Sequence, residues 1–171
     1  MRAFFLLLIY TVALSAETVA GLKWTPSPGW KSSGTTSMRA ATYPVAPVAG
    51  DREAAECAVY FFGLGQGGSV QANLDRWTGQ FTAGGKPATA KVTKITIHGL
   101  PVTTIDVSGE YSGMAGPAAA PVPATGYRLL GAIVESPGGN VFIKFTGPAR
   151  TMAANQPKFQ QLLDSFEKAG K

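Results

Sequence analysis

The chain has 171 residues, of which 45% are hydrophobic and 15% are charged, and it contains 21 glycines and 12 prolines. Glycine and proline together lie above the roughly 12% of average proteins but below the roughly 25–30% typical of disorder, so we expect a folded domain rich in loops. A chain of this length forms one hydrophobic core, which excludes a multi-domain assembly. Its composition also excludes a collagen-like fibre and a coiled coil.

Basic residues outnumber acidic residues by 15 to 10, which gives a net charge of +5. This balance permits weak attraction to anionic surfaces, and we keep such binding as one alternative for the function. The densest basic group, Lys86, Lys91 and Lys94, is not interleaved with aromatic residues, as platforms for single-stranded nucleic acids are. We therefore expect no specific binding of nucleic acids.

Residues 1–20 have the pattern of a secretory signal peptide. Arg2 is followed by an apolar run that ends at Leu14 and then by small residues, which is the order of the charged, apolar and cleavage regions of such signals. The apolar run is too short for a membrane helix of about 20 residues, so we expect no transmembrane span after cleavage. The mature protein is expected in the periplasm or outside the cell.

The cleavage point is left open by the sequence. Small residues are placed for cleavage after Ser15, after Ala16 or after Ala20. We take residues 1–20 as the signal peptide and residues 21–171 as a single domain.

Two strands are predicted in the first half of the domain. Residues 37–43 alternate in polarity and end before Pro44, as a strand does. Residues 57–62 form a continuous apolar run that is typical of a central strand buried on both faces. Cys57, the only cysteine, lies in this run, so no intramolecular disulfide forms and we interpret it as a small buried hydrophobic residue.

A glycine-rich segment follows the second strand. Gly63, Gly65 and Gly68 have the spacing of the dinucleotide-binding fingerprint between a strand and a helix. The acidic residue that binds the ribose is missing from the expected place, and the hairpins that follow contradict a parallel sheet. We interpret the segment as a turn that needs positive φ angles, and we expect no cofactor.

A first helix is predicted over residues 69–81, with Ser69 or Gly68 as its N-cap. The apolar residues that fall on one helical stripe are Val70, Leu74, Trp77 and Phe81.

Three side chains of this helix are the candidate ligand-binding residues. Arg76, Trp77 and Gln80 offer a cation, an aromatic ring and an amide side by side, and groups of this kind dominate binding sites. The structural alternative is that Trp77 packs on the sheet and Arg76 is solvated.

Two β-hairpins are predicted in the second half. Residues 91–98 and 100–111 are rich in Val, Ile and Thr and meet at His98-Gly99. Residues 127–135 and 141–146 flank a turn that contains proline and two glycines. Hairpins of this kind predict antiparallel pairing. Residues 112–126 are dominated by Pro, Ala and Gly, so we expect a mobile loop between the hairpins.

A second helix is predicted over residues 151–168, and its apolar face must cover the sheet. The apolar residues at helical spacing are Met152, Phe159, Leu162, Leu163 and Phe166. Pro157 lacks the N–H that a helix interior uses, so the helix either kinks there or begins with Asn155 as its cap.

Three short segments carry a resemblance to a known family. They are Pro28-Gly29-Trp30, the segment His98-Gly99-Leu100-Pro101-Val102 that leads to Gly109-Glu110-Tyr111, and the closing Phe159-x-x-Leu-Leu-x-Ser-Phe166. In this order, over about residues 22–167, the chain resembles the PsbP-like fold, which the photosystem II extrinsic protein PsbP shares with bacterial DcrB-like exported proteins.

The resemblance implies an α+β fold in which an antiparallel β-sheet is flanked by two main α-helices, an α/β/α sandwich. It also implies an accessory or binding role rather than catalysis. No motif here matches the metal-binding or assembly residues of the photosynthetic members, so none of their residues is carried over.

Residues for metal or nucleophilic chemistry are scarce. His98 is the only histidine, and its predicted place at a hairpin tip makes a catalytic base hard to desolvate and orient. Asp51, Glu53 and Glu56 are close enough in sequence to hold Ca²⁺ weakly, although such a cluster is more often a solvated loop. We expect no metal site and no catalytic residue.

We therefore interpret the chain as an exported, non-catalytic binding or accessory protein of the bacterial cell envelope, with an envelope protein or a small ligand as its partner. The rival interpretation is an envelope hydrolase that uses paired carboxylates. Its candidates are Asp75, Asp106, Glu110 and Glu135. A pocket with two converging acidic side chains would favour the hydrolase, and a closed core with shallow grooves would favour the accessory role.

Overall fold

The computed structural model describes residues 16–113 and 124–170. Its helices are α1 (Val70–Thr78) and α2 (Ala149–Asp164). Its strands are β1 (Glu17–Val19), β2 (Leu22–Trp24), β3 (Arg39–Val45), β4 (Ala55–Tyr60), β5 (Phe81–Ala83), β6 (Lys86–Pro87), β7 (Lys91–Ile97), β8 (Leu100–Tyr111), β9 (Ala124–Val134), β10 (Val141–Pro148) and β11 (Glu167–Lys168).

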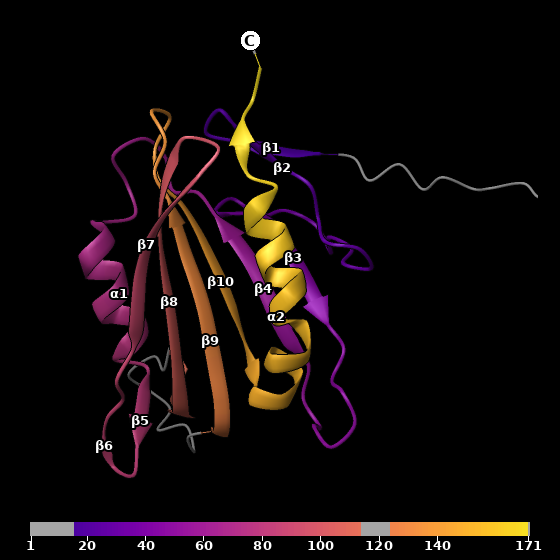
Figure 1. The fold of residues 1–171 in the computed structure, drawn as a ribbon, viewed down its shortest axis with the longest axis vertical. Coiled ribbons are helices and arrows are strands. Elements are labelled where there is room, and N and C mark those ends of the chain that lie inside the picture. The colour runs from indigo at the N-terminus through magenta and orange to yellow at the C-terminus, as the bar shows by residue number, and fades with distance from the viewer. Residues whose placement is uncertain (1–15, 114–123, 171) are drawn as a thin grey trace, which may run out of the picture.

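An eight-stranded sheet forms the centre of the molecule (Figure 1). Its order is β3-β4-β10-β9-β8-β5-β6, and β7 pairs with β8 beside β5. Every pairing in it is antiparallel. A smaller sheet has the order β1-β2-β11. The predicted α+β class and both predicted hairpins, β7–β8 and β9–β10, are confirmed.

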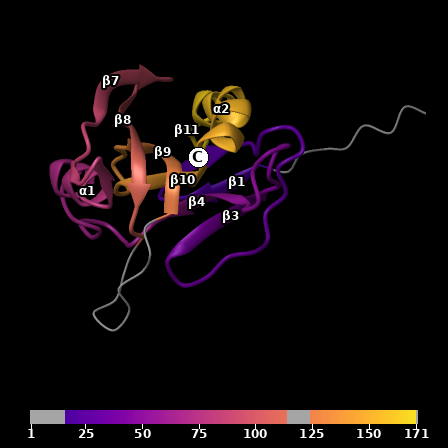
Figure 2. The same ribbon diagram turned by 90° about the horizontal axis from the view of Figure 1, so that it is seen from below.

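The two helices cover opposite faces of this sheet. Successive side chains of a strand point to opposite faces, so the contacts of one strand show which helix lies on which side. Along β10, Val141, Ile143 and Phe145 belong to the apolar cluster that includes the buried residues of α2. Phe142 belongs to a second cluster, which includes Leu74 and Trp77 of α1. Figure 2 shows α1 and α2 well apart on either side of the strands. The predicted sandwich is therefore formed.

The α2 face closes around an aromatic cluster that the N-terminal strands complete. Trp24 of β2 stacks on Phe166, with ring centroids 5.1 Å apart. Its indole Nε1 donates a hydrogen bond of 2.9 Å to the hydroxyl of Tyr43, and that hydroxyl donates to Glu17 of β1 at 2.8 Å. Burial raises the pKa of Tyr43, so this hydroxyl keeps its proton.

Residues 17–20 therefore belong to the folded domain. A leader cut after Ala20 would take β1 with it, whereas a cut after Ser15 or Ala16 would leave the strand intact. Residues 1–15 of the expected signal peptide and residues 114–123 of the expected mobile loop lie outside the described residues. β8 ends at Tyr111, as predicted, whereas β9 begins at Ala124, inside the range expected for the loop.

The second helix begins earlier than either alternative from the sequence. It runs from Ala149 to Asp164, with Pro157 inside it and exposed, rather than starting at Asn155. Pro148 at the N-cap offers no side-chain hydrogen bond. A carboxylate oxygen of Asp51 accepts instead from the backbone N–H of Thr151 at 2.8 Å. This long-range cap gives an otherwise unpaired N–H a hydrogen-bond acceptor. The negative charge of Asp51 also interacts favourably with the positive end of the helix dipole, so the helix can start here.

The first helix ends earlier than predicted. It stops at Thr78 with Gly79 as its C-cap, so Gln80 lies beyond the helix and Phe81 opens β5. Phe81 lies eleven positions after Val70, which fits a helical stripe. The same apolar residue also fits the start of a strand that packs beside the helix. Ser69 is the N-cap, and its hydroxyl accepts from the N–H of Ala72 at 3.1 Å.

The first strand of the large sheet also extends past its predicted end. It passes through Pro44 to Val45. Because β3 is the outermost strand of the sheet, the missing N–H of Pro44 costs less there than in a central strand. The predicted central strand is β4, shifted to Ala55–Tyr60 and lying between β3 and β10. Cys57 in it is buried, as the sequence indicates.

In the part of the chain that the structure describes, neither helix is long and apolar enough to cross a membrane.

The packing of α1 on the sheet gives a first prediction. Gly131 lies under the ring of Trp77, and a Cβ added there would sit 2.7 Å from Trp77 Cζ3 and 2.8 Å from Ile105 Cγ2. We predict that Gly131→Ala lowers the free energy of unfolding by about 1–3 kcal/mol, because the ring cannot give way without lifting α1. Urea denaturation measures this change.

The matched control is Gly170→Ala, since a Cβ at Gly170 would meet no atom within 4 Å. Equal stability of the two variants would contradict the packing described for Trp77.

Candidate functional site

A pocket of about 400 Å³ lies on the α1 face of the sheet, beside the helix. One helix is about 10 Å wide and strands are about 4.8 Å apart, so a helix covers about two strands. Trp77 of α1 lies over β8 and β9, against Ile105 and Gly131. The part of the same face formed by β10, β4 and β3 is left without a covering helix, and the pocket opens there.

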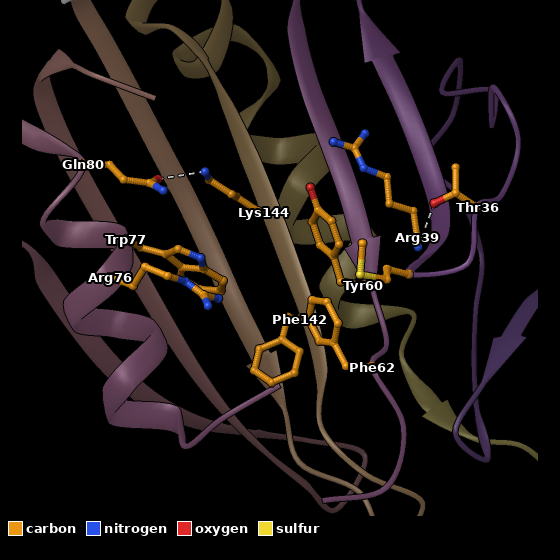
Figure 3. Close-up of a pocket in the computed structure, with 10 residues that line it drawn as sticks. Thr36, Arg39, Tyr60, Phe62, Arg76, Trp77, Gln80, Phe142 and Lys144 are labelled. Carbon is orange, nitrogen blue, oxygen red and sulfur yellow. Dashed lines mark hydrogen bonds between the residues drawn. The ribbon is translucent and has the colours of Figure 1, made fainter. Parts of the chain in front are cut away.

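The pocket draws its walls from four separate stretches of the chain (Figure 3). The residues that line it are Thr36, Met38, Arg39, Tyr60, Phe62, Arg76, Trp77, Gln80, Phe142 and Lys144.

One wall is aromatic. Tyr60 stacks on Phe62, with centroids 6.0 Å apart and planes 9° apart, and Phe62 packs against Phe142 at 5.6 Å. Gly67 allows this arrangement, since a Cβ there would lie 2.7 Å from the ring of Phe142 and 2.8 Å from that of Phe62. Trp77 closes the opposite side of the pocket (Figure 3). The walls thus suit a flat apolar group.

The glycine-rich loop supports this wall through its backbone shape. Gly63, Gly65, Gly67 and Gly68 all have positive φ, between 70° and 105°, a region that other residues rarely adopt. The loop leads from an antiparallel strand into α1, so the interpretation as a turn that requires glycine is confirmed.

Three cationic side chains meet the pocket from three different elements. Arg39 of β3 forms an ion pair of 2.9 Å with Glu56 and lies over the ring of Tyr60, 5.2 Å from its centroid. Arg76 of α1 donates to the side-chain oxygen of Asn73. Lys144 of β10 points toward Gln80, which follows α1 (Figure 3).

Lys144 is the most enclosed of the three cations. Its Nζ donates to Gln80 Oε1 at 2.8 Å and to the Tyr111 hydroxyl at 3.2 Å, and it lies 5.4 Å from the centre of the Tyr111 ring. Burial lowers the pKa of Lys144 to about 8; the nearby charges of Arg76 and Arg39 lower it further, and Glu56 opposes them. The ammonium group is thus held in a position where its charge is costly.

The three residues proposed from the sequence all line this pocket, each in a different way. Trp77 is buried, as the structural alternative requires. Arg76 is exposed, with its guanidinium bonded to Asn73. Gln80 is buried and lies beyond the end of the helix rather than within it. Ligand binding by them stays a prediction.

The sequence reasoning missed the residues on the sheet side of the pocket. Arg39, Tyr60 and Lys144 lie far apart in the chain and meet only because β4 pairs with both β3 and β10. One signal was present in the sequence. Lys144 is the single charged residue in the apolar segment 141–145, and in a strand it shares a face with Phe142.

Three of the four candidate carboxylates of the hydrolase interpretation have separate structural partners, and the fourth is exposed. Both oxygens of Asp106 accept from Arg128, at 2.8 and 2.7 Å. Glu110 accepts from the hydroxyl of Thr82 at 3.1 Å. Asp75 accepts from the Gln71 amide at 2.8 Å, and Glu135 is exposed at the end of β9.

The acidic residues considered for Ca²⁺ are separated in the same way. Asp51 accepts from the hydroxyl of Thr151 at 2.7 Å as well as capping α2. Glu53 accepts from the Tyr127 hydroxyl, and burial together with this bond raises the pKa of Tyr127 to about 12. Within residues 16–113 and 124–170, no three His, Cys, Asp or Glu side chains are grouped as metal ligands.

Comparisons with known proteins bear on the fold. No family model and no curated protein matches the chain. Among solved structures it is similar to cyanobacterial PsbP (CyanoP) of Synechocystis sp. PCC 6803, with a TM-score of 0.52 and 8% identity over 96% of this chain and 98% of that one. It is also similar to PA94 of Pseudomonas aeruginosa, a protein of unknown function suggested to be a regulator. For PA94 the TM-score is 0.50 and the identity 12%, over 88% of this chain and 94% of that one.

At these identities the likeness shows the fold alone. The resemblance to the PsbP-like fold, drawn from the sequence, is confirmed.

The environment of Lys144 gives a prediction for stability against pH. Its pKa is about 8 in the folded chain and near the ordinary 10.5 when unfolded. Between these values the unfolded chain binds one more proton, so stability rises with pH. We predict that the stability of the wild type relative to Lys144→Met rises from about pH 8 to about pH 10 and is constant below about pH 7.

Urea denaturation of both proteins across this pH range measures the difference between their free energies of unfolding. The other titrating groups are shared by the two proteins, so their contributions cancel in this difference. A difference that stays flat or falls with rising pH would show that Lys144 is not buried as described.

Proposed function

We propose that the chain is an exported, non-catalytic binding or accessory protein of the bacterial cell envelope, and that the pocket beside α1 holds a small ligand with a flat apolar body. The observation that carries the proposal is the set of four aromatic rings, Tyr60, Phe62, Trp77 and Phe142, around one cavity of about 400 Å³. Cavities of roughly 300–1,000 Å³ with apolar walls and a few polar groups are typical of small-ligand sites.

The chemistry of the lining favours binding over the hydrolase interpretation. The ten lining residues include two arginines and one lysine but no acidic residue, whereas glycoside hydrolysis needs two facing carboxylates. A second hollow near α2 does contain Asp51 and Glu53. Their oxygens are engaged with Thr151 and Tyr127, which suits a structural role.

Binding to the pocket can be tested with an uncharged aromatic probe. We predict that N-phenyl-1-naphthylamine binds with one saturable site and gains fluorescence, and that Phe62→Ala weakens its affinity about tenfold by removing part of the aromatic wall. Fluorescence titration measures both affinities.

Phe61→Ala is the matched control. Phe61 is the preceding residue and is similarly half-buried, but it packs against the cluster on the α2 face. Equal effects of the two variants, or no saturable binding by the wild type, would refute the proposal.

Export can be tested on the full chain produced in a bacterium. We propose cleavage before β1, because Glu17–Val19 pairs with β2 and Glu17 accepts from Tyr43. Mass spectrometry of the envelope and medium fractions is expected to show a mature protein that starts at Ala16 or Glu17. An uncleaved chain in the cytoplasm would contradict export, and a start at Gly21 would contradict the role given to β1.

A further inference from the structure

The charges around the pocket are not balanced by the protein. Arg39 is paired with Glu56. The hydrogen-bond partners of Arg76 and Lys144, by contrast, are the neutral side chains of Asn73, Gln80 and Tyr111. Within the described part of the chain, neither Arg76 nor Lys144 takes part in an ion pair. The pocket therefore holds an excess of positive charge beside its aromatic wall.

An unbalanced cation in an enclosed apolar site is unfavourable unless something supplies the opposite charge. The charged and titratable groups that face Lys144 are Arg76 from α1, Arg39 from β3, Glu56 and Tyr60 from β4, and Tyr111 from β8, while the β9 residue beside it is Gly131. Only Glu56 among them is acidic, and it is committed to Arg39. An anion entering the pocket would remove this cost and form charge-assisted hydrogen bonds.

We infer that the ligand is an aromatic organic anion, whose carboxylate or phosphate group is bound by Lys144 and Arg76 while its ring lies against Tyr60, Phe62 and Phe142. This inference rests on the proposed function, because it adds the charge of the ligand to the flat apolar body already argued. Gln80 positions the Lys144 ammonium through its 2.8 Å hydrogen bond.

The geometry separates this ligand from simpler ones. An inorganic anion would leave the four rings of the lining unused, and a neutral aromatic molecule would leave the two cations unpaired. The two cations also come from opposite walls, one from α1 and one from β10, so a group bound by both spans the space between helix and sheet. Free phosphate and a phosphorylated ring share the same headgroup chemistry and are distinguished by the test.

The test is a calorimetric titration of the full domain with inorganic phosphate and with four compounds that share one ring: 2-naphthoate, 2-naphthyl phosphate, 2-naphthylmethanol and 2-naphthylmethylamine. The wild type is expected to bind one or both anions about tenfold or more tightly than the alcohol, since hydrogen bonds to a charged group are stronger than those to a neutral one. The amine is expected to bind most weakly. The preferred anion identifies the headgroup.

Two variants assign the effect to the pocket. Lys144→Met is expected to reduce the preference for the anion over the alcohol to within about twofold, because it removes the charge and keeps the apolar stem. Lys94→Met, on the exposed face of β7, is expected to leave the preference unchanged. Retained binding of the alcohol by Lys144→Met shows that the pocket is still formed.

The outcomes separate the two proposals. If the alcohol binds as tightly as the anions, this inference is wrong and the proposed function stands. If none of the ring compounds binds, both fail. If inorganic phosphate binds as tightly as 2-naphthyl phosphate, the aromatic wall has no part in recognition and the inference is wrong. Loss of the preference in Lys94→Met would show that it comes from net charge alone.

Discussion

The structure depends on the alternation of side chains along β10, which lies between β4 and β9 in the large sheet. Its odd positions, Val141, Ile143 and Phe145, supply the core under α2. Its even positions, Phe142 and Lys144, face the other way and line the pocket. Because a strand has a period of two residues, a slip of one position would bury Lys144 in the larger core and expose the three apolar residues.

The two faces of the sheet differ in how completely they are covered. The α2 face is closed by a helix of 16 residues together with the small sheet and its Trp24–Phe166 stack. The α1 face has a helix of only nine residues, which covers part of the sheet and leaves the rest to an aromatic wall and three cations. This difference explains why the α2 face is closed, whereas the α1 face keeps a pocket beside its own apolar cluster.

Much of the fold was predictable because its signals are local. The turn at His98, where φ is 46°, the β-branched strands on either side and the cap at Ser69 are all encoded within a few residues. Local signals failed where distant residues decide the outcome. Asp51 caps α2 from a loop about a hundred positions away, so the start of that helix could not be read from its own sequence.

The site was predictable in part for the same reason. Arg76, Trp77 and Gln80 are close together in the chain and all line one pocket. Gln80 does so from beyond the end of the helix. Arg39 and Lys144 join them only through the register of β3, β4 and β10, which no local pattern specifies. The cationic character of the pocket thus became visible only with the sheet in place.

The central proposal is that the ligand binds on the half-open α1 face of the sheet. Two-dimensional NMR of the ¹⁵N-labelled domain with added 2-naphthoate tests this most directly. The account predicts chemical-shift changes at the Trp77 indole and along β3, β4 and β10, with the indoles of Trp24 and Trp30 unchanged. Changes centred on α2 or on the loop of Asp51 and Glu53 would contradict it.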